Sequence, residues 1–385
     1  MVSRFSRGFA VAPAAAESSC PSFSSSSPSP PSSAPAKPLP PPFALVRPEI
    51  DAVAERLRRS IASDIPALGD AAGYFFRRGA EGKRLRSTVL LLMSSAVSAT
   101  RSPDADRAEV DELPPFEPAR TLRRRQQRLT EISELIHVAT LLHDDVIDGA
   151  ETRRGKPALN RVMGNKVAIL AGDFLLARAS VTLAALGDPE VIALVSRCLE
   201  HLVSGEIMQL TASADDAASM DHYLRKTYSK TGALIANCCR AVAVLGGATE
   251  DQREAAWEYG KHLGIAFQLV DDVLDYVSSE DELGKPAHQD LEAGLATAPA
   301  LYAAEERPEL VPILRRRFCQ PGDADKALEI VRQTKGIERA REAAAKHAAL
   351  ACAALERLPK PQVQEAKEAR QALVDLTQLV LSRKK

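Results

Sequence analysis

Two short acidic motifs with the same spacing constrain the fold of this chain more than any other feature. The first is DDVID at residues 144–148, and the second is DDVLD at residues 271–275, which begins 127 residues later (271 minus 144). Both lie in apolar stretches, and in a helix the first and last aspartates of each motif stack one turn apart on one face. Because buried carboxylates need a cation, each motif predicts a positively charged partner.

A divalent cation is the simplest partner for these carboxylates. Mg²⁺ takes one or two carboxylates, keeps several waters and completes its shell with the phosphate oxygens of a substrate. One motif alone would fit a solvent-exposed helix face equally well, whereas two copies predict facing helices that clamp a metal–diphosphate cluster. The predicted metal ligands are Asp144, Asp145, Asp148, Asp271, Asp272 and Asp275.

The pattern of apolar residues predicts an all-α chain. Ile50, Val53, Leu57, Ile61 and Ile65 recur at three-to-four spacing, which is typical of an amphipathic helix. Between residues 120 and 285 there are only two prolines, and no alternating strand pattern stands out. We therefore expect residues 43–385 to form a single all-helical domain, a bundle of roughly ten or more helices with a central core.

The first 42 residues have a different composition. They hold 12 serines and 10 of the 25 prolines of the chain, and such a segment cannot support a packed core, so we expect it to be disordered. It carries Arg4 and Arg7 early and no acidic residue before Glu17, which is typical of organelle transit peptides. We predict a mitochondrial location, with the plastid and a plain disordered tail as the alternatives.

Composition excludes several other classes of function. The formal net charge of −1 gives no general electrostatic reason to bind nucleic acid. The six cysteines contain no CxxC pair, so they suggest neither a zinc site nor a disulfide framework, and they fit a reducing compartment. No run approaches 18 uncharged apolar residues, so a membrane span is not expected.

Basic residues accompany both acidic motifs. Lys83 and Arg86 lie three apart at a predicted helix start, where backbone N–H groups and the helix dipole favour an anion. Arg153 and Arg154 follow the first motif, and arginine makes bidentate contacts with phosphate. A solvated charge run would explain any one of these sites, but their repetition beside the acidic motifs favours phosphate binding.

Further candidates lie on the predicted helices themselves. Lys230, Thr231 and Lys285 are possible phosphate contacts. His137 lies seven residues before Asp144, about two helical turns, so both side chains can point to the same side. A lone histidine on a helix is usually structural. Only the acidic and basic motifs near His137 favour a ligand role for it. His143 is assigned no function.

On these residues the chain resembles the trans-isoprenyl diphosphate synthase family, and within it the long-chain polyprenyl (decaprenyl or solanesyl) diphosphate synthases of ubiquinone synthesis. The resemblance runs from about residue 44 to the C-terminus. It includes both aspartate-rich motifs, the GKRLR element at residues 82–86 and the RRG element at residues 153–155, in that order. It implies an all-α, isoprenoid-synthase-type helical bundle around a deep central cavity.

The resemblance also implies roles for individual residues. The six aspartates would hold about three Mg²⁺ ions on an allylic diphosphate, and Arg153 would grip that diphosphate. The residues implied for isopentenyl diphosphate are Lys83, Arg86, His137 and Arg154. Those implied to contact the allylic diphosphate or to steady the developing cation are Lys230, Thr231, Gln268 and Lys285, with Gln209 at another substrate-facing position. The implied catalytic set is Asp144, Asp145, Asp148, Lys230, Asp271 and Asp272.

The chain departs from the family pattern in a few places. Glu81 replaces a frequent glycine and Ser87 a frequent proline, and both changes leave the phosphate ligands in place. Leu295 follows Gly294 where a second lysine often stands. This last departure puts one diphosphate contact in doubt, but not the class of reaction.

The implied activity is a Mg²⁺-dependent prenyltransferase that condenses farnesyl or geranylgeranyl diphosphate repeatedly with isopentenyl diphosphate. Ala139 and Thr140 lie five and four residues before Asp144, on the expected path of the growing chain. Short-chain members usually carry a bulky aromatic residue there, so the small residues favour a long all-trans product. A short-chain geranylgeranyl diphosphate synthase is the alternative within the family.

Two other classes remain as rivals. A class I terpene cyclase also uses a DDxxD helix, but it gives no reason for the second motif or for Lys83 and Arg86. A regulatory subunit of a heteromeric synthase would be expected to have lost aspartates, and all six are present. We expect a homodimer or a heteromer with a related subunit, and peripheral membrane contact because a long polyprenyl product is nearly insoluble in water.

Overall fold

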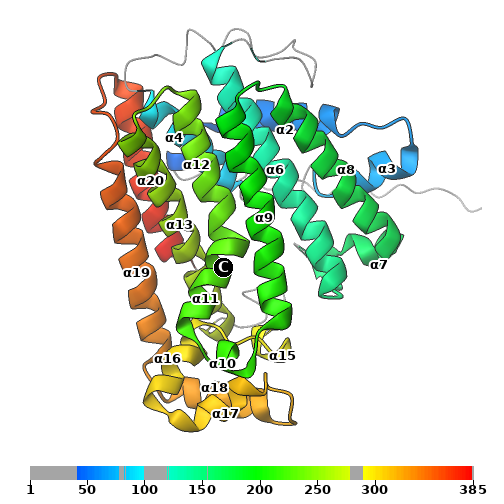
Figure 1. Cartoon of the computed structure of the whole chain (residues 1–385), viewed down its shortest axis with the longest axis vertical. Coiled ribbons are helices and arrows are strands. Elements are labelled where there is room, and N and C mark those ends of the chain that lie inside the picture. Colours follow the sequence, from blue (N-terminus) through cyan, green and yellow to red (C-terminus); the bar gives the residue numbers. More distant parts are fainter. Residues whose placement is uncertain are drawn as a thin grey trace, which may run out of the picture. The chain divides into compact units, whose positions relative to one another are not determined.

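The computed structural model describes residues 41–77, 82, 84–98, 119, 121–153, 155–277 and 289–383. Residues 40–385 form one compact unit. In its described part almost all regular structure is helical, as Figure 1 shows. The all-α class predicted from the sequence is therefore confirmed.

The first half of the bundle is built on the long helix that carries the first acidic motif. Its elements are α1 (Pro41–Leu45), α2 (Arg47–Ser60), α3 (Pro66–Ala72), α4 (Leu85–Val97), α6 (Leu122–Ile147), β1 (Thr152–Arg153), β2 (Lys156–Pro157), α7 (Leu159–Met163), α8 (Asn165–Ala184) and α9 (Pro189–Thr211). Helix α1 begins two residues before the expected start of the helical region, because proline is well tolerated in the first turn of a helix.

The second half contains the helix that carries the second motif. Its elements are α10 (Ala214–Ala217), α11 (Met220–Thr227), the π-helical turn η1 (Tyr228–Gly232), α12 (Ala233–Leu245), α13 (Glu250–Val277), α15 (Gln289–Glu292), α16 (Ala298–Glu306), the 3₁₀ turn η2 (Pro308–Leu310), α17 (Val311–Arg315), α18 (Asp323–Arg332), α19 (Gly336–Leu355) and α20 (Gln364–Leu381). Helices α16 to α18 gather at one end of the bundle (Figure 1).

Local sequence signals account for the starts of both motif helices. Thr121 caps α6, its hydroxyl accepting a hydrogen bond from the backbone N–H of Arg124. Thr249 and Gln252 form a reciprocal capping box before α13, with backbone-to-side-chain distances of 3.0 and 3.4 Å. These caps fix where each helix begins, and so which residues of the motif face inwards.

Helix α13 joins two apolar cores. Its first half, through Tyr259 and Leu263, belongs to a core shared with α2, α4, α6, α8, α9, α12 and α20. Its second half, through Leu269 and Val273, belongs to a smaller core with α16, α18 and α19. The second acidic motif therefore lies on one continuous helix that both cores hold in place.

Close helix packing depends on two glycines of α13. A Cβ atom at Gly264 would lie 2.7 Å from the Cα of Gly232, and one at Gly260 would lie 2.7 Å from the Cα of Ala236. Neither backbone contact could relax by moving a flexible side chain. These glycines let α13 approach η1 and α12 closely enough to bring the second motif next to the residues of η1.

Buried ion pairs fasten α2 to α6. Arg123 donates two hydrogen bonds to Glu49, at 2.8 and 2.7 Å, and both side chains are about 5% exposed. Arg56 of α2 pairs with Glu131 of α6 in the same layer. Because removing one partner would strand a buried charge, such pairs set the register between two helices.

The structure corrects two details of the sequence analysis. Ile65 does not extend the amphipathic helix: α2 ends at Ser60, and Ile65 is extended and 62% exposed. The residue before a proline is disfavoured in the helical conformation, and Pro66 follows it. A two-stranded antiparallel hairpin, β1–β2, also interrupts the helices, with Gly155 at φ +72° in its turn.

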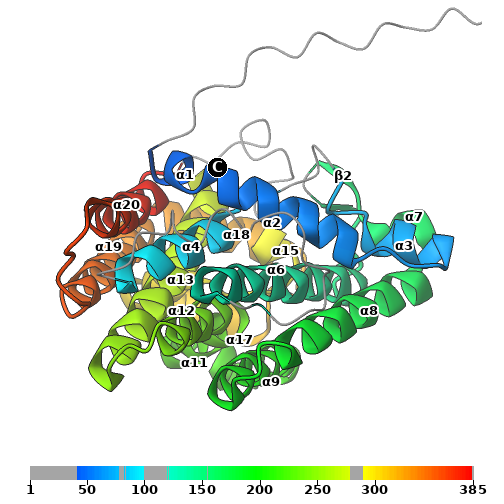
Figure 2. The same cartoon turned by 90° about the horizontal axis from the view of Figure 1, so that it is seen from above.

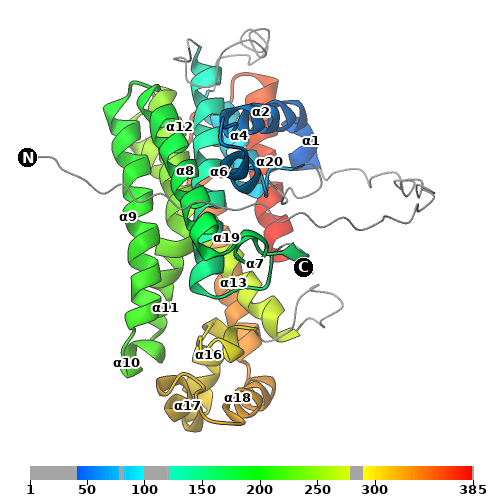
Figure 3. The ribbon, with the colours of Figure 1, turned by 90° about the vertical axis from the view of Figure 1, so that its right-hand side faces the viewer.

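One helix differs from the expectation about membranes. By length and composition alone, helix α8 could cross a membrane: its most apolar 18-residue stretch has a mean hydropathy of 1.7. Within the chain, 39% of that stretch is buried. It carries Asp173 and Arg178. Helices α8 and α9 form one outer edge of the bundle, as Figures 2 and 3 show.

Candidate active site

The first motif lies at the C-terminal end of α6. Asp144 and Asp145 belong to its last turn, and Asp148 is the C-cap residue. Asp145 is 1% exposed, and the Nε atom of Arg153 donates to its Oδ1 atom at 2.8 Å. The turn at Gly155 folds the hairpin so that Arg153 returns to α6. The middle aspartate is thus already neutralised by the protein.

The two outer aspartates of this motif differ from Asp145. In the described part of the chain, the side chains of Asp144 and Asp148 have no hydrogen bond or ion pair. Burial raises the pKa of Asp144 from 3.8 to about 6, although nearby Lys230 opposes the shift. Burial also raises the pKa of Asp148. These carboxylates are unfavourable as anions until a cation reaches them.

The second motif is held by side chains from several elements. Asp272 is 1% exposed and accepts hydrogen bonds from the Tyr223 hydroxyl at 2.6 Å and from the Gln268 amide at 2.9 Å. Burial, with the negative charge of Asp290 adding to it, raises the pKa of Asp272 to about 7. The middle aspartate of this motif also points into the protein.

The outer aspartates of the second motif contact two later segments. Arg383, beyond α20, forms an ion pair with Asp271 at 2.9 Å, and its guanidinium stacks 4.2 Å from the centroid of the Phe267 ring. The backbone N–H of Asp290 donates to Asp275 at 3.3 Å. The contact of Arg383 links the C-terminal segment directly to the site.

Lysine and amide side chains lie between the two motifs. Lys230, in the π-helical turn η1, pairs with Glu206 at 2.5 Å and donates to Gln209 at 3.3 Å. Gly205 makes room for it, because a Cβ atom there would lie 2.8 Å from the Cγ of Lys230. The Thr231 hydroxyl donates to Gln268 at 3.1 Å, which continues the network to Asp272.

Two adjoining cavities bring the motifs together. One has a volume of about 220 Å³ and is lined by Asp148 of the first motif and Asp272 of the second, with Lys226 and Lys230 also in its wall. The other, of about 1230 Å³, shares Asp148 and Lys226 with it and adds Arg153. We call the two together the acidic cleft. One aspartate of each predicted motif, Asp148 and Asp272, lines the acidic cleft.

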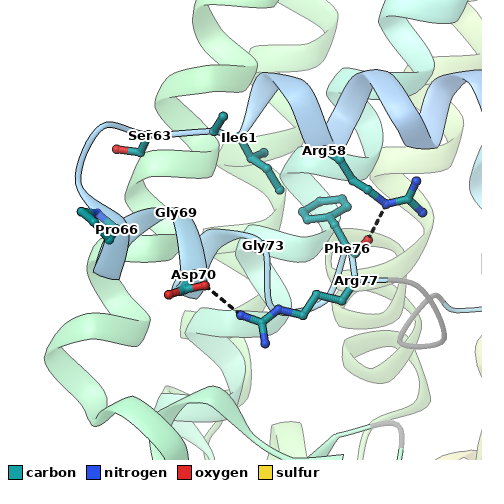
Figure 4. Close-up of a pocket in the computed structure, with 10 residues that line it drawn as sticks. Arg58, Ile61, Ser63, Pro66, Gly69, Asp70, Gly73, Phe76 and Arg77 are labelled. Carbon is teal, nitrogen blue, oxygen red and sulfur yellow. Dashed lines mark hydrogen bonds and ion pairs between the residues drawn. The ribbon is translucent and has the colours of Figure 1, made fainter. Parts of the chain in front are cut away.

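A separate cavity of about 380 Å³ lies between α2 and α3 (Figure 4). The Nε atom of Arg58 donates to the carbonyl oxygen of Phe76 at 3.0 Å, and Arg77 pairs with Asp70 at 3.0 Å. Both guanidinium groups are thus engaged within the wall, and neither acidic motif lines this cavity. The acidic cleft is therefore the better candidate for phosphate chemistry.

The residues expected to hold a second diphosphate are only partly described. The Nη1 atom of Arg86 and the Nε2 atom of His137 lie 3.0 Å apart, so α4 and α6 bring these two side chains together. Lys83, Arg154 and Lys285 lie outside the described residues. His143, to which we assigned no function, packs on α8, where a Cβ atom at Gly172 would lie 2.2 Å from its ring.

Sequence reasoning missed several residues of the acidic cleft, namely Glu206, Tyr223, Lys226, Asp290 and Arg383. Lys226 could have been found, because it precedes Lys230 by one helical turn. Tyr223 resembles any core aromatic residue, and Asp290 and Arg383 are far from the motifs in sequence. No local signal could have identified these three.

The outer carboxylates of the first motif are the candidates for holding a metal in the cleft. Among the described residues, no group of three or more histidine, cysteine, aspartate or glutamate side chains is close enough to hold a metal ion alone. The outer aspartates of the first motif have raised pKa values and lack protein partners. Oxygen donors of this kind fit Mg²⁺ that takes its remaining ligands from water and phosphate.

Comparison with known proteins gives consistent matches. The family model described as Polyprenyl synthetase matches residues 66–331. A mitochondrial solanesyl-diphosphate synthase 1 from Oryza sativa is 50% identical over 344 residues, which cover 89% of this chain and 79% of the relative.

Solved structures give the same result. An apo Arabidopsis medium/long-chain length prenyl pyrophosphate synthase is 43% identical, with a TM-score of 0.72, covering 89% of this chain and 99% of that one. A polyprenyl synthase from Caulobacter crescentus, complexed with calcium and isoprenyl diphosphate, is 30% identical, with a TM-score of 0.75 over 90% of this chain and 98% of that one.

Proposed function

Because the chain belongs to the polyprenyl synthetase family, we propose that it is a Mg²⁺-dependent trans-polyprenyl diphosphate synthase. It would condense farnesyl or geranylgeranyl diphosphate repeatedly with isopentenyl diphosphate, making a long all-trans polyprenyl diphosphate for the side chain of ubiquinone. One observation carries the proposal: aspartates of both motifs, with Lys230 between them, line one cleft.

The hydrogen bonds of the two motifs suggest that some of the six aspartates position their neighbours and others bind metal. Asp145 and Asp272 are buried and engaged by protein donors, so they position their neighbours. Asp144 and Asp148, which have no side-chain partner among the described residues, are the better candidates to bind metal directly, and Asp271 would have to give up its ion pair with Arg383 to join them. Asp275 holds the backbone of Asp290, and so shapes the wall of the cleft. About three Mg²⁺ ions would fit a substrate diphosphate held between two helices.

The charges of the cleft explain how the reaction would start. When bound, Mg²⁺ ions neutralise the diphosphate and stabilise its negative charge as the allylic C–O bond breaks. Arg153 and Lys230 add donors on either side of the leaving diphosphate. Lys230 is kept in place by Glu206 and Gln209, so its position does not depend on the substrate.

The second half of the reaction needs little from the protein. The double bond of isopentenyl diphosphate attacks the allylic cation, and the departing diphosphate can accept the proton that is lost, so a dedicated side-chain base is not required. Water must be excluded from the cation, and the apolar helices around the cleft serve this purpose.

The length of the product depends on the space along α6. Ala139 is buried and Thr140 bonds back to the carbonyl oxygen of His137, so neither side chain blocks the helix face below Asp144. A cavity of about 130 Å³ lies further along, lined by Ile132 and Ile136 of α6 together with residues of α8 and α9. Ile132 is twelve residues before Asp144, about 18 Å along the helix. Space at this distance from the first motif favours a long product over geranylgeranyl diphosphate.

We propose that a second copy of the chain covers the outer edge formed by α8 and α9. Ile169, Leu170 and Val181 of α8 and Val203 and Ile207 of α9 are exposed there. Exposed apolar side chains on two neighbouring helices fit an interface between subunits. Light scattering should give a dimer for the purified chain and a monomer for the Leu170→Asp/Val203→Asp variant. A monomer for the unsubstituted chain would favour a related subunit as partner.

The proposed location is the mitochondrion. The rice relative is named as mitochondrial, and the composition of the first 42 residues fits a transit peptide. Imaging of the full chain fused to a fluorescent protein would test this location against the plastid.

The activity itself is tested with the purified chain, isopentenyl diphosphate, farnesyl diphosphate and Mg²⁺. A ladder of products longer than geranylgeranyl diphosphate is expected. Product that stops at geranylgeranyl diphosphate would support the short-chain alternative, and no product from a folded protein would mean that a partner subunit is required.

A further inference from the structure

Lys226 is a cation of the acidic cleft that the roles described above leave unused. It lies in the last turn of α11, one turn before Lys230, and it lines both cavities of the cleft. Lys230 is neutralised by Glu206 at 2.5 Å. Within the described residues, by contrast, Lys226 has no ion pair and no hydrogen bond from its ammonium group. An ammonium group that lines a cavity and has no anion paired with it is suited to bind an anionic ligand.

The surroundings of Lys226 hold it towards the cleft. Its Nζ atom lies 5.8 Å from the centroid of the Tyr223 ring, and the hydroxyl of the same tyrosine is tied to Asp272. Burial lowers the pKa of Lys226, while Asp272 and Asp290 raise it and Lys230 lowers it further. The ammonium is therefore partly desolvated, and in such a site an incoming anion interacts with it more strongly than in water.

An apolar side chain, Leu295, stands in the wall of the cleft where the family often has a lysine. Leu295 lines both cavities with Lys226. Its backbone N–H is tied to the carbonyl oxygen of Asp290 at 2.8 Å, which fixes this apolar side chain in the wall. Among the described residues, the cations that line the smaller cavity are Lys226 and Lys230, and Lys230 is already paired with Glu206. Lys226 is therefore placed to supply a diphosphate there with the charge that Leu295 lacks.

We propose that Lys226 is a diphosphate-binding residue, which contributes from α11 the positive charge that the wall at Leu295 lacks. This inference rests on the proposed function of the cleft. Its ligand is the diphosphate group itself, whether carried by the allylic substrate or released as inorganic diphosphate.

Binding of inorganic diphosphate in the presence of Mg²⁺, measured by calorimetry on the full chain, tests the proposal directly. Lys226→Met should weaken binding about tenfold or more, since a hydrogen bond to a charged group is lost, and Lys226→Arg should restore most of it. Arg225→Met is the matched control: Arg225 is the adjacent residue, is 63% exposed and pairs only with Asp221 among the described residues. Equal affinities for the Lys226→Met and Arg225→Met variants would overturn the proposal.

A double variant asks whether the charge or the position matters. Leu295→Lys, introduced into the Lys226→Met protein, should recover diphosphate affinity from its own position in the wall of the cleft. Steady-state kinetics should show the KM for the allylic substrate rising more than the KM for isopentenyl diphosphate in Lys226→Met. Failure of Leu295→Lys to recover any affinity, or equal changes in both KM values, would count against a role in binding this diphosphate.

Chemical labelling tests the unsubstituted protein and does not depend on the folding of any variant. Mg²⁺ and inorganic diphosphate should protect Lys226 from acetylation, as mapped by mass spectrometry, while exposed Lys367 on α20 stays reactive. Unchanged labelling of Lys226 would contradict the proposal. If the chain makes polyprenyl product but Lys226 is neither protected nor required, the inference fails while the proposed function stands.

Discussion

The two acidic motifs share one spacing, but the protein treats them differently. In the first, only the middle residue, Asp145, has side-chain partners among the described residues, while Asp144 and Asp148 have raised pKa values. In the second, the partners come from four directions: Tyr223 of α11, Gln268 of α13 itself, Asp290 of α15 and Arg383 beyond α20. The first motif therefore depends on a cation from solution, whereas the second is assembled by the fold.

The largest effect should come from removing an outer aspartate of the first motif. Asp144→Ala should lower turnover by about a thousandfold or more, because the charge of the leaving diphosphate loses its metal. The melting temperature without Mg²⁺ should be unchanged or higher, since Asp144 has no protein partner to lose. Asp271→Ala should show a similar loss of turnover with a small loss of stability, because its pair with Arg383 is broken. Near-normal turnover in both variants would rule out the metal-clamp assignment.

Positions five residues before each motif allow a matched comparison. Ala139 and Ala266 are both buried alanines on the motif helices, but only α6 leads to the cavity at Ile132 and Ile136. Ala139→Phe should shorten the products, as measured by chromatography of the dephosphorylated alcohols. Ala266→Phe should leave their length unchanged and cost about 1–3 kcal/mol of stability through overpacking. If both variants, or neither, shorten the product, the path does not run along α6.

The support of the second motif can be weakened one bond at a time. Tyr223→Phe removes the donor to Asp272 and leaves a buried carboxylate with one partner fewer. We expect the free energy of unfolding, measured by chemical denaturation, to fall by about 1–3 kcal/mol. Turnover should fall roughly tenfold, since Asp272 positions neighbouring groups of the cleft. Tyr228→Phe is a suitable control, because Tyr228 packs against Trp257, away from the motif. Equal effects of the two changes would argue against a specific role for Tyr223.

The smallest effect concerns pH. The pKa of Asp144 rises from 3.8 to about 6 on folding and that of Asp272 to about 7, so the folded chain holds protons that the unfolded chain has lost. Their contribution is full below pH 4 and disappears as pH rises towards 7. Melting temperatures measured without Mg²⁺ should therefore fall by a few degrees over this range, and Asp144→Asn should reduce the fall. A pH profile identical to that of the unsubstituted chain would contradict the raised pKa of Asp144.

The fold and part of the site could be predicted from the sequence, but the contacts that distinguish the two motifs could not. The all-α fold and the meeting of the two motifs follow from local patterns, since DDxxD and helical periodicity are written in consecutive residues. Ile65 was misplaced because the proline after it overrides the periodicity. Tertiary packing alone brings Tyr223, Asp290 and Arg383 to the second motif, and no spacing in the sequence indicates these contacts. The residues that distinguish the motifs were therefore the ones that could not be predicted.

The π-helical turn η1 has a genetic consequence. Its five residues, Tyr228 to Gly232, hold one residue more than a regular helical turn would need, between α11 and α12. Deleting the codon of Tyr228 or Ser229 would let α11 and α12 fuse into one regular helix and would rotate Lys226 relative to Lys230 by about 100°. Neighbouring side chains can adjust to a substitution in η1, but they cannot compensate for a change in the number of its residues. Selection should therefore remove insertions and deletions from this short segment much more strictly than from the loops that connect helices, such as the one between α8 and α9.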